Sequence, residues 1–210
     1  MDIIAGNMIY LIPALGLLGV IIMIGKVVWV TKQETGEENM RELASHIAEG
    51  AMAFLRAEWK VLTYYSIVTG LILAWLGTQP ESHSHPLMAV SFIIGAFFSC
   101  LAGYVGMNIA TKANVRTAQS ARGSLKHALK VSFNGGTVMG LGVASLAVIG
   151  MGVLFIIFNA MFVEDPGSTD QMRRALEVLA GFSLGSESIA LFARVGGGIY
   201  TKAADVGADL

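Results

Sequence analysis

Five long apolar segments limit what this chain can fold into more than any other feature. They cover roughly residues 8–30, 61–77, 86–110, 131–163 and 175–200. A helix needs about 20 mainly apolar residues to cross the hydrocarbon core of a bilayer. That core holds no water for the backbone, so only helices and closed barrels can span it. Strand-like alternation of any length is absent. We therefore predict an all-α, polytopic transmembrane helical bundle that forms a single membrane domain over residues 1–210.

The composition agrees with a membrane protein and argues against some partners. Charged residues make up 14% of the chain, whereas soluble domains carry about 25%. The 25 glycines suit close helix packing in lipid, where small residues let backbones approach. The formal net charge of −1 lacks the basic excess of nucleic-acid-binding proteins. The predicted surroundings are thus a lipid bilayer, with no nucleic acid.

The distribution of lysine and arginine predicts how the chain is oriented. Twelve of the 14 basic residues lie in or beside segments 31–60, 111–130 and 201–210, and the other two are Arg173 and Arg174. Cytoplasmic loops carry the excess of basic residues in membrane proteins. We therefore predict that these three segments are cytoplasmic, with the N-terminus outside the cell (inner) membrane. Within 31–60, residues 40–55 are predicted to form an amphipathic helix that leads into the second span.

A line of polar residues follows one face of the fifth predicted helix. At about 100° per residue, the five residues fall within an arc of about 80°; they are Glu187, Arg194, Lys202, Asp205 and Asp209. Glu187 lies near mid-membrane, where an ionisable side chain costs about 2.5–3.5 kcal/mol on insertion scales and usually marks an ion or proton pathway. A structural ion pair with Arg194 is the alternative, and we favour the pathway.

The C-terminal end of this line combines a cation with two carboxylates. Lys202 beside Asp205 and Asp209 suits a polyanion that arrives with a divalent metal. By spacing alone, a solvated helix end with an ordinary Lys–Asp pair is at least as good an explanation. The run 196–198 favours a site, because three helical glycines cost roughly 1 kcal/mol each. Such a run makes sense where a backbone or a ligand approaches closely.

Three stretches resemble the membrane-bound, ion-pumping inorganic pyrophosphatases. Residues 194–210 read Arg-Val-Gly-Gly-Gly-Ile-Tyr-Thr-Lys-Ala-Ala-Asp-Val-Gly-Ala-Asp-Leu and resemble the signature of that family. Residues 49–55 resemble the start of its helix two, and residues 103–119 resemble the end of helix three with its loop. The resemblance implies a homodimer with about sixteen transmembrane helices, each long enough to cross a bilayer. Five of these would lie in this chain, as about the first third of the protein.

The resemblance also implies an activity and roles for the polar residues. Members hydrolyse pyrophosphate on the cytoplasmic side and pump H⁺ or Na⁺ outward. Lys202 would contact pyrophosphate, and Asp205 and Asp209 would hold Mg²⁺ that bridges to phosphate oxygens. Arg194 would belong to the coupling region. Many members have a small or hydroxyl residue at the position of Glu187 and place the gating glutamate on helix six, whereas others place it on helix five, which would make Glu187 the gate of the ion path. A carboxylate at this position favours H⁺ as the ion, with Na⁺ as the alternative. K⁺ is a candidate activator.

Two expectations concern completeness and the alternative function. The family's further metal-binding and water-activating aspartates follow the signature, so we expect this chain to carry part of the active site, with no complete catalytic set, and to be inactive alone. The alternative function is a secondary transporter or membrane-assembly subunit that uses the same polar line without hydrolysis. The signature favours the pump, because such a protein needs no Mg²⁺–phosphate site at a helix end.

Overall fold

The computed structural model describes residues 2–79, 85–165 and 167–209. It contains five α-helices: α1 (Asp2–Thr31), α2 (Glu38–Leu76), α3 (Leu87–Gly123), α4 (Leu125–Phe162) and α5 (Thr169–Asp209). Each is long and apolar enough to cross a membrane. No strand occurs in the described residues, so the predicted all-α class is confirmed.

The helices extend well beyond the apolar segments, and one expected loop is wrong. The resemblance placed a loop after helix three, within 111–130, but α3 continues to Gly123 and α4 begins at Leu125. Only Ser124 leaves helical geometry, with φ −163° and ψ 127°. This stretch is rich in Ala, Arg, Lys and Gln, which have high helix propensity and hold a helix together in water. The predicted helix 40–55 is likewise continuous with α2.

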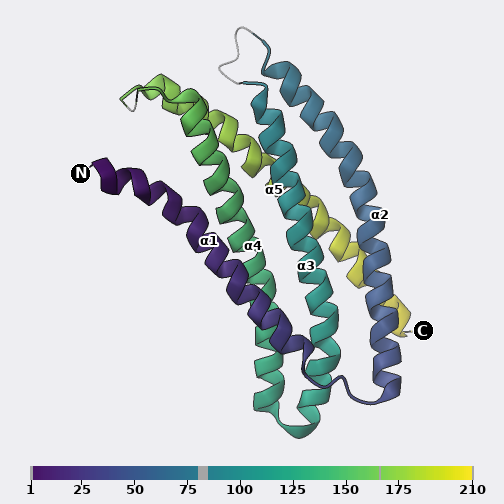
Figure 1. Cartoon of the computed structure of the whole chain (residues 1–210). Helices are drawn as coiled ribbons and strands as arrows, with labels where there is room; N and C mark the ends of the chain where they lie inside the picture. Colours follow the sequence, from purple (N-terminus) through teal and green to yellow (C-terminus); the bar gives the residue numbers. More distant parts are fainter. Residues whose placement is uncertain (1, 80–84, 166, 210) are drawn as a thin grey trace.

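The connections alternate between the two ends of the bundle (Figure 1). The α1–α2 connection and the α3–α4 turn lie at one end, while the start of α1 and the α4–α5 connection lie at the other. Helix α5 runs obliquely behind α3 and α2. The basic residues that flank the α1–α2 and α3–α4 connections therefore lie at the same end of the molecule.

Helix α3 is the centre of the bundle, since it contacts all four other helices. One cluster of buried side chains joins α4 and α5, a second joins α1, α3 and α4, and a third joins α2, α3 and α5; they centre on Phe182, Val138 and Ile189. Helix α1 packs on α4 rather than on α2, its neighbour in sequence.

Glycines bring the backbones of α3 and α5 together. A Cβ atom added at Gly95, Gly181 or Gly185 would lie within 3.0 Å of a backbone carbonyl oxygen on the facing helix. Real Cβ atoms do not come that close, so no larger residue fits without moving a helix. Gly16 and Gly19 of α1 also lie close to α4, where an added Cβ would first meet the side chains of Ile149 and Ser145. These contacts agree with the expectation that glycine serves close packing in lipid.

The short α1–α2 connection is fixed to the end of α3. Arg122 forms an ion pair with Glu37, and the Arg116 guanidinium donates a hydrogen bond of 3.2 Å to the Thr31 carbonyl. Gly36 adopts a φ of 86°, in the region that L-residues with a side chain rarely enter. The connection is therefore a defined turn held by α3.

Candidate functional site

Helices α2, α3, α4 and α5 line a cavity of about 530 Å³. Most of its lining is apolar or small, with Phe98, Ala102 and Gly106 from α3 and Met139 from α4. Among the described residues that line it, three carry charge: Glu58 from α2, and Glu187 and Arg194 from α5. The structure thus brings the two residues of the predicted ion pathway to one largely apolar cavity, although both Glu187 and Arg194 are exposed.

Helix α5 sets the spacing of Glu187 and Arg194. The helix is unbroken over Thr169–Asp209, so seven residues make nearly two turns and place the two side chains about 10 Å apart along the axis on one face. The ion pairs formed by the described residues do not include this one. The alternative of a direct structural pair therefore has no support in the contacts of α5.

Glu58 belongs to the cavity but was not predicted as a site residue. Its Oε1 atom is buried and has no hydrogen-bond partner among the described residues. Helical spacing in the sequence places Glu58 on the same face of α2 as the apolar residues Ala51, Leu55 and Leu62. These three residues are buried in the structure. A charged residue on a buried stripe is the pattern that would have revealed it.

Gly196 explains why α2 and α5 approach closely beside the cavity. A Cβ at this position would lie 2.7 Å from Oε1 of Glu58 and 3.1 Å from Cζ of Phe54. Phe54 also packs against Tyr200, with ring centroids 5.1 Å apart. The close approach expected of the three-glycine run is thus found at Gly196 alone, since Gly197 and Gly198 have no such neighbour within 4 Å.

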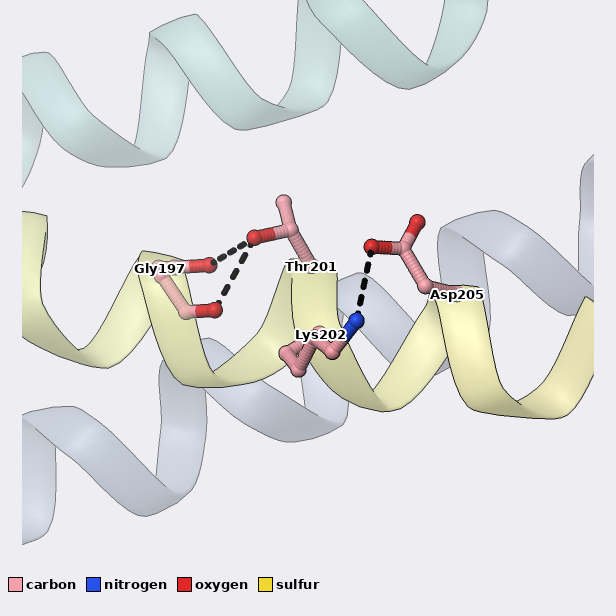
Figure 2. Close-up of polar contacts among 5 residues, drawn as sticks. Gly197, Thr201, Lys202 and Asp205 are labelled. Carbon is pink, nitrogen blue, oxygen red and sulfur yellow. Dashed lines mark hydrogen bonds and ion pairs between the residues drawn. The ribbon is translucent and has the colours of Figure 1, made fainter.

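The predicted cation and first carboxylate meet near the end of α5 (Figure 2). Nζ of Lys202 lies 3.9 Å from Oδ2 of Asp205. The Thr201 hydroxyl lies 3.1 and 3.0 Å from the carbonyl oxygens of Gly197 and Gly198. Lys202, Asp205 and Asp209 are all exposed. Leu210, which ends the predicted signature, lies outside the described residues.

The two aspartates supply a partial donor set for a metal. Carboxylate oxygens are ligands that Mg²⁺ prefers, and this ion commonly binds through one or two carboxylates together with substrate phosphates and water. In the part of the chain that the structure describes, no group of three or more His, Cys, Asp or Glu residues gathers to hold a metal. Among the described residues, Asp205 and Asp209 could therefore supply two carboxylates to a metal rather than a closed set of ligands.

Comparison with known proteins gives consistent matches. Residues 17–210 match the family described as inorganic H⁺ pyrophosphatase. The chain is 47% identical over 183 residues to a putative K(+)-stimulated pyrophosphate-energized sodium pump of Clostridium tetani, covering 87% of this chain and 24% of that protein. It is 42% identical over 200 residues to the K(+)-insensitive pyrophosphate-energized proton pump 2 of Moorella thermoacetica, covering 95% and 27%.

A third relative extends the match to another sodium pump. The K(+)-stimulated pyrophosphate-energized sodium pump of Thermotoga maritima is 39% identical over 194 residues, covering 86% of this chain and 25% of that protein. The chain thus spans about a quarter of the length of the curated relatives it matches, which is less than the third that was predicted.

Proposed function

The chain belongs to the inorganic H⁺ pyrophosphatase family, and we propose that it forms part of a membrane pump that couples pyrophosphate hydrolysis to ion transport. The proposal is supported by relatives that are pyrophosphate-energised proton or sodium pumps. One structural observation carries it: a single helix, α5, contributes two of the three charged residues that line the cavity and an exposed Lys–Asp pair at its end.

In this proposal the charged end of α5 faces the cytoplasm. The support is the excess of basic residues in the connections at one end of the bundle, namely Lys32 and Arg41 around the first and Lys112, Arg116, Arg122, Lys126 and Lys130 around the second. The N-terminus would lie outside the cell (inner) membrane, and the ion would move outward. Apolar side chains such as Leu15 and Leu71 are exposed, which suits contact with lipid, with further helices or with the second subunit of a homodimer.

We assign the binding of pyrophosphate to the end of α5. Lys202 would contact the phosphate oxygens, and Asp205 and Asp209 would hold Mg²⁺, which neutralises phosphate charge when bound. A carboxylate repels a bare phosphate, so the two aspartates need the metal before the anion can approach. Lys202 and the aspartates are exposed and close in sequence, so each can reach a ligand that arrives from water.

The cavity residues are assigned to coupling. Glu187 would take up and release the transported ion, and Arg194 would link that event to the phosphate site further along α5. An ionisable side chain within a membrane span usually marks an ion or proton pathway, and for this reason we propose H⁺ as the ion. The relatives include sodium pumps and both K⁺-stimulated and K⁺-insensitive proteins. The experiments therefore also measure Na⁺ transport and the effect of K⁺ on activity.

The phosphate site is tested in the full-length pump that contains this chain, reconstituted in vesicles. Hydrogen bonds to charged groups contribute about 1.5–3 kcal/mol, so Lys202→Ala should lower kcat/KM for pyrophosphate about 10- to 150-fold. Lys126→Ala is the matched control, since Lys126 is also an exposed lysine near a helix end. Equal activity of the two variants would overturn the assignment of Lys202.

The coupling residues need a separate measurement of transport. Glu187→Ala should abolish ion accumulation, monitored with a pH-sensitive dye and with radioactive Na⁺ in parallel. Vesicles that accumulate the ion normally with this variant would exclude Glu187 as the gate. The 210-residue chain by itself should not hydrolyse pyrophosphate, because its described residues offer two carboxylates for the metal.

A further inference from the structure

The cavity contains one charged group that the proposed function does not use, the Glu58 carboxylate. Its Oε1 atom is buried without a hydrogen-bond partner among the described residues. Glu58 enters the cavity from α2, whereas Glu187 and Arg194 enter from α5. From α3, Ser99 lines the same cavity. A buried carboxylate oxygen left without a donor is unfavourable, so this position favours an occupant that supplies a proton or a positive charge.

The charges around the cavity indicate what that occupant is. Its described lining residues include two carboxylates and one guanidinium, which leaves a formal charge of −1 when both acids are ionised. One proton or one monovalent cation makes the group neutral. In apolar surroundings an uncompensated charge is strongly disfavoured. The cavity is therefore suited to hold one monovalent cation at a time.

We propose that Glu58 is a second ion-exchanging residue of the transport path, sharing the transported cation with Glu187 across the cavity. This inference rests on the proposed function, because it presupposes that the cavity conducts an ion. It adds that the path is built by two helices: α2 supplies one carboxylate, and α5 supplies the other together with Arg194. Movement of α5 relative to α2 would then change how the two carboxylates share the cation.

Gly196 gives this arrangement an independent geometric probe. A methyl group at position 196 would lie 2.7 Å from Oε1 of Glu58, too close to be accommodated without a shift. The atom that has to move is the end of a flexible side chain, so the helices can stay in place while the carboxylate turns away. Gly196→Ala thus displaces the Glu58 carboxylate without removing it.

The test uses the full-length pump in vesicles and measures pyrophosphate hydrolysis and ion accumulation on the same preparation. Glu58→Gln keeps the size of the side chain and removes its charge, and it should lower ion accumulation at least tenfold. Glu58→Asp, which keeps the charge, should restore part of the transport. Glu42→Gln is the matched control, because Glu42 lies on the same helix and is exposed.

The outcomes separate this inference from the function on which it rests. If the wild-type protein does not accumulate ions when given pyrophosphate, the proposed function fails. If the wild-type protein pumps and Glu58→Gln pumps within twofold of it, the role of Glu58 fails while the function stands. If Glu58→Gln does not fold, Gly196→Ala decides: transport reduced at least threefold supports the role of Glu58, and unchanged transport overturns it.

Discussion

Gly185 lies where the backbones of α3 and α5 meet, and its replacement by alanine should force these helices apart. The new Cβ would lie 2.8 Å from the carbonyl carbon of Phe92 and 3.0 Å from the Ala96 nitrogen, whereas ordinary van der Waals contact begins at 3.4 Å. The obstructing atoms are backbone, so a rotamer change cannot relieve the contact. The nearest obstructing atom is the Phe92 carbonyl oxygen, 2.0 Å from the new Cβ, so ordinary contact at 3.4 Å requires a separation of about 1.4 Å. A gap of about 1 Å already forfeits about half of the dispersion attraction between facing atoms.

The expected cost follows from two opposing terms. Overpacking a close-packed interface costs about 1–3 kcal/mol, occasionally more, and alanine in place of a helical glycine returns up to about 1 kcal/mol. Gly95 and Gly181 hold the same interface, so a separation at Gly185 loosens their contacts too. We therefore expect an overpacking cost at the upper end of that range, about 3 kcal/mol. Less the gain of about 1 kcal/mol from alanine, Gly185→Ala should lower the free energy of unfolding by about 2 kcal/mol.

Equilibrium unfolding of the purified chain in detergent measures this effect. Helix content is followed by far-ultraviolet circular dichroism, and tertiary structure by the fluorescence of Trp29, Trp59 and Trp75. Gly198→Ala is the control in the same helix, because no side chain or facing backbone comes within 4 Å of a Cβ there. It should stabilise the chain by up to about 1 kcal/mol. If Gly185→Ala is as stable as Gly198→Ala, the backbone contact between α3 and α5 is refuted.

Three further perturbations address the core, the turn and the metal. Phe182 is 1% exposed and central to the α4–α5 cluster, so Phe182→Ala should lower the free energy of unfolding by about 3–5 kcal/mol; a loss below about 1 kcal/mol in the same unfolding assay would contradict its burial. Gly36→Ala should destabilise by about 1–2 kcal/mol, because its φ of 86° is strained for alanine; an unchanged midpoint would contradict that backbone conformation. In the full-length pump, chelation of Mg²⁺ should stop hydrolysis, and Asp205→Asn should raise the half-maximal Mg²⁺ concentration on the order of tenfold, or about 1.4 kcal/mol; an unchanged Mg²⁺ dependence would remove Asp205 from the metal site.

The sequence predicted which segments form helices but not which helices touch. Apolar runs of sufficient length define the spans because the bilayer leaves the backbone few choices. Which helices pack against one another depends instead on their shape. Small residues such as Gly19 and Gly95, which allow a facing helix to approach closely, decide it. A helix that is apolar all round, as α1 is, shows no preferred face in its pattern. The packing of α1 on α4 was therefore beyond sequence reasoning.

For the candidate site, too, the sequence predicted positions along one helix but not contacts between helices. Glu187 and Arg194 lie on one helix, so helical spacing was sufficient to place them on one face, and the structure brings both to one cavity. Glu58 lies on a different helix, and only the approach of α2 to α5 at Gly196 brings it to that cavity. The expected loop within 111–130 was wrong for another reason: polar composition marks exposure to water but does not by itself end a helix.

Because α1 packs on α4, this contact can form only after the ribosome has synthesised α4. Roughly 100 residues separate the end of α1 from the start of α4, which at about 5–20 residues per second is about 5–20 s of synthesis. During that interval α1 lies in the bilayer without α4. Its mean hydropathy of 2.4 over the most apolar window is that of a helix that can remain in lipid without a packing partner. Until α4 has been synthesised, the surface around Gly16 and Gly19 faces lipid or another helix. During this period a wrong helix can bind where α4 belongs.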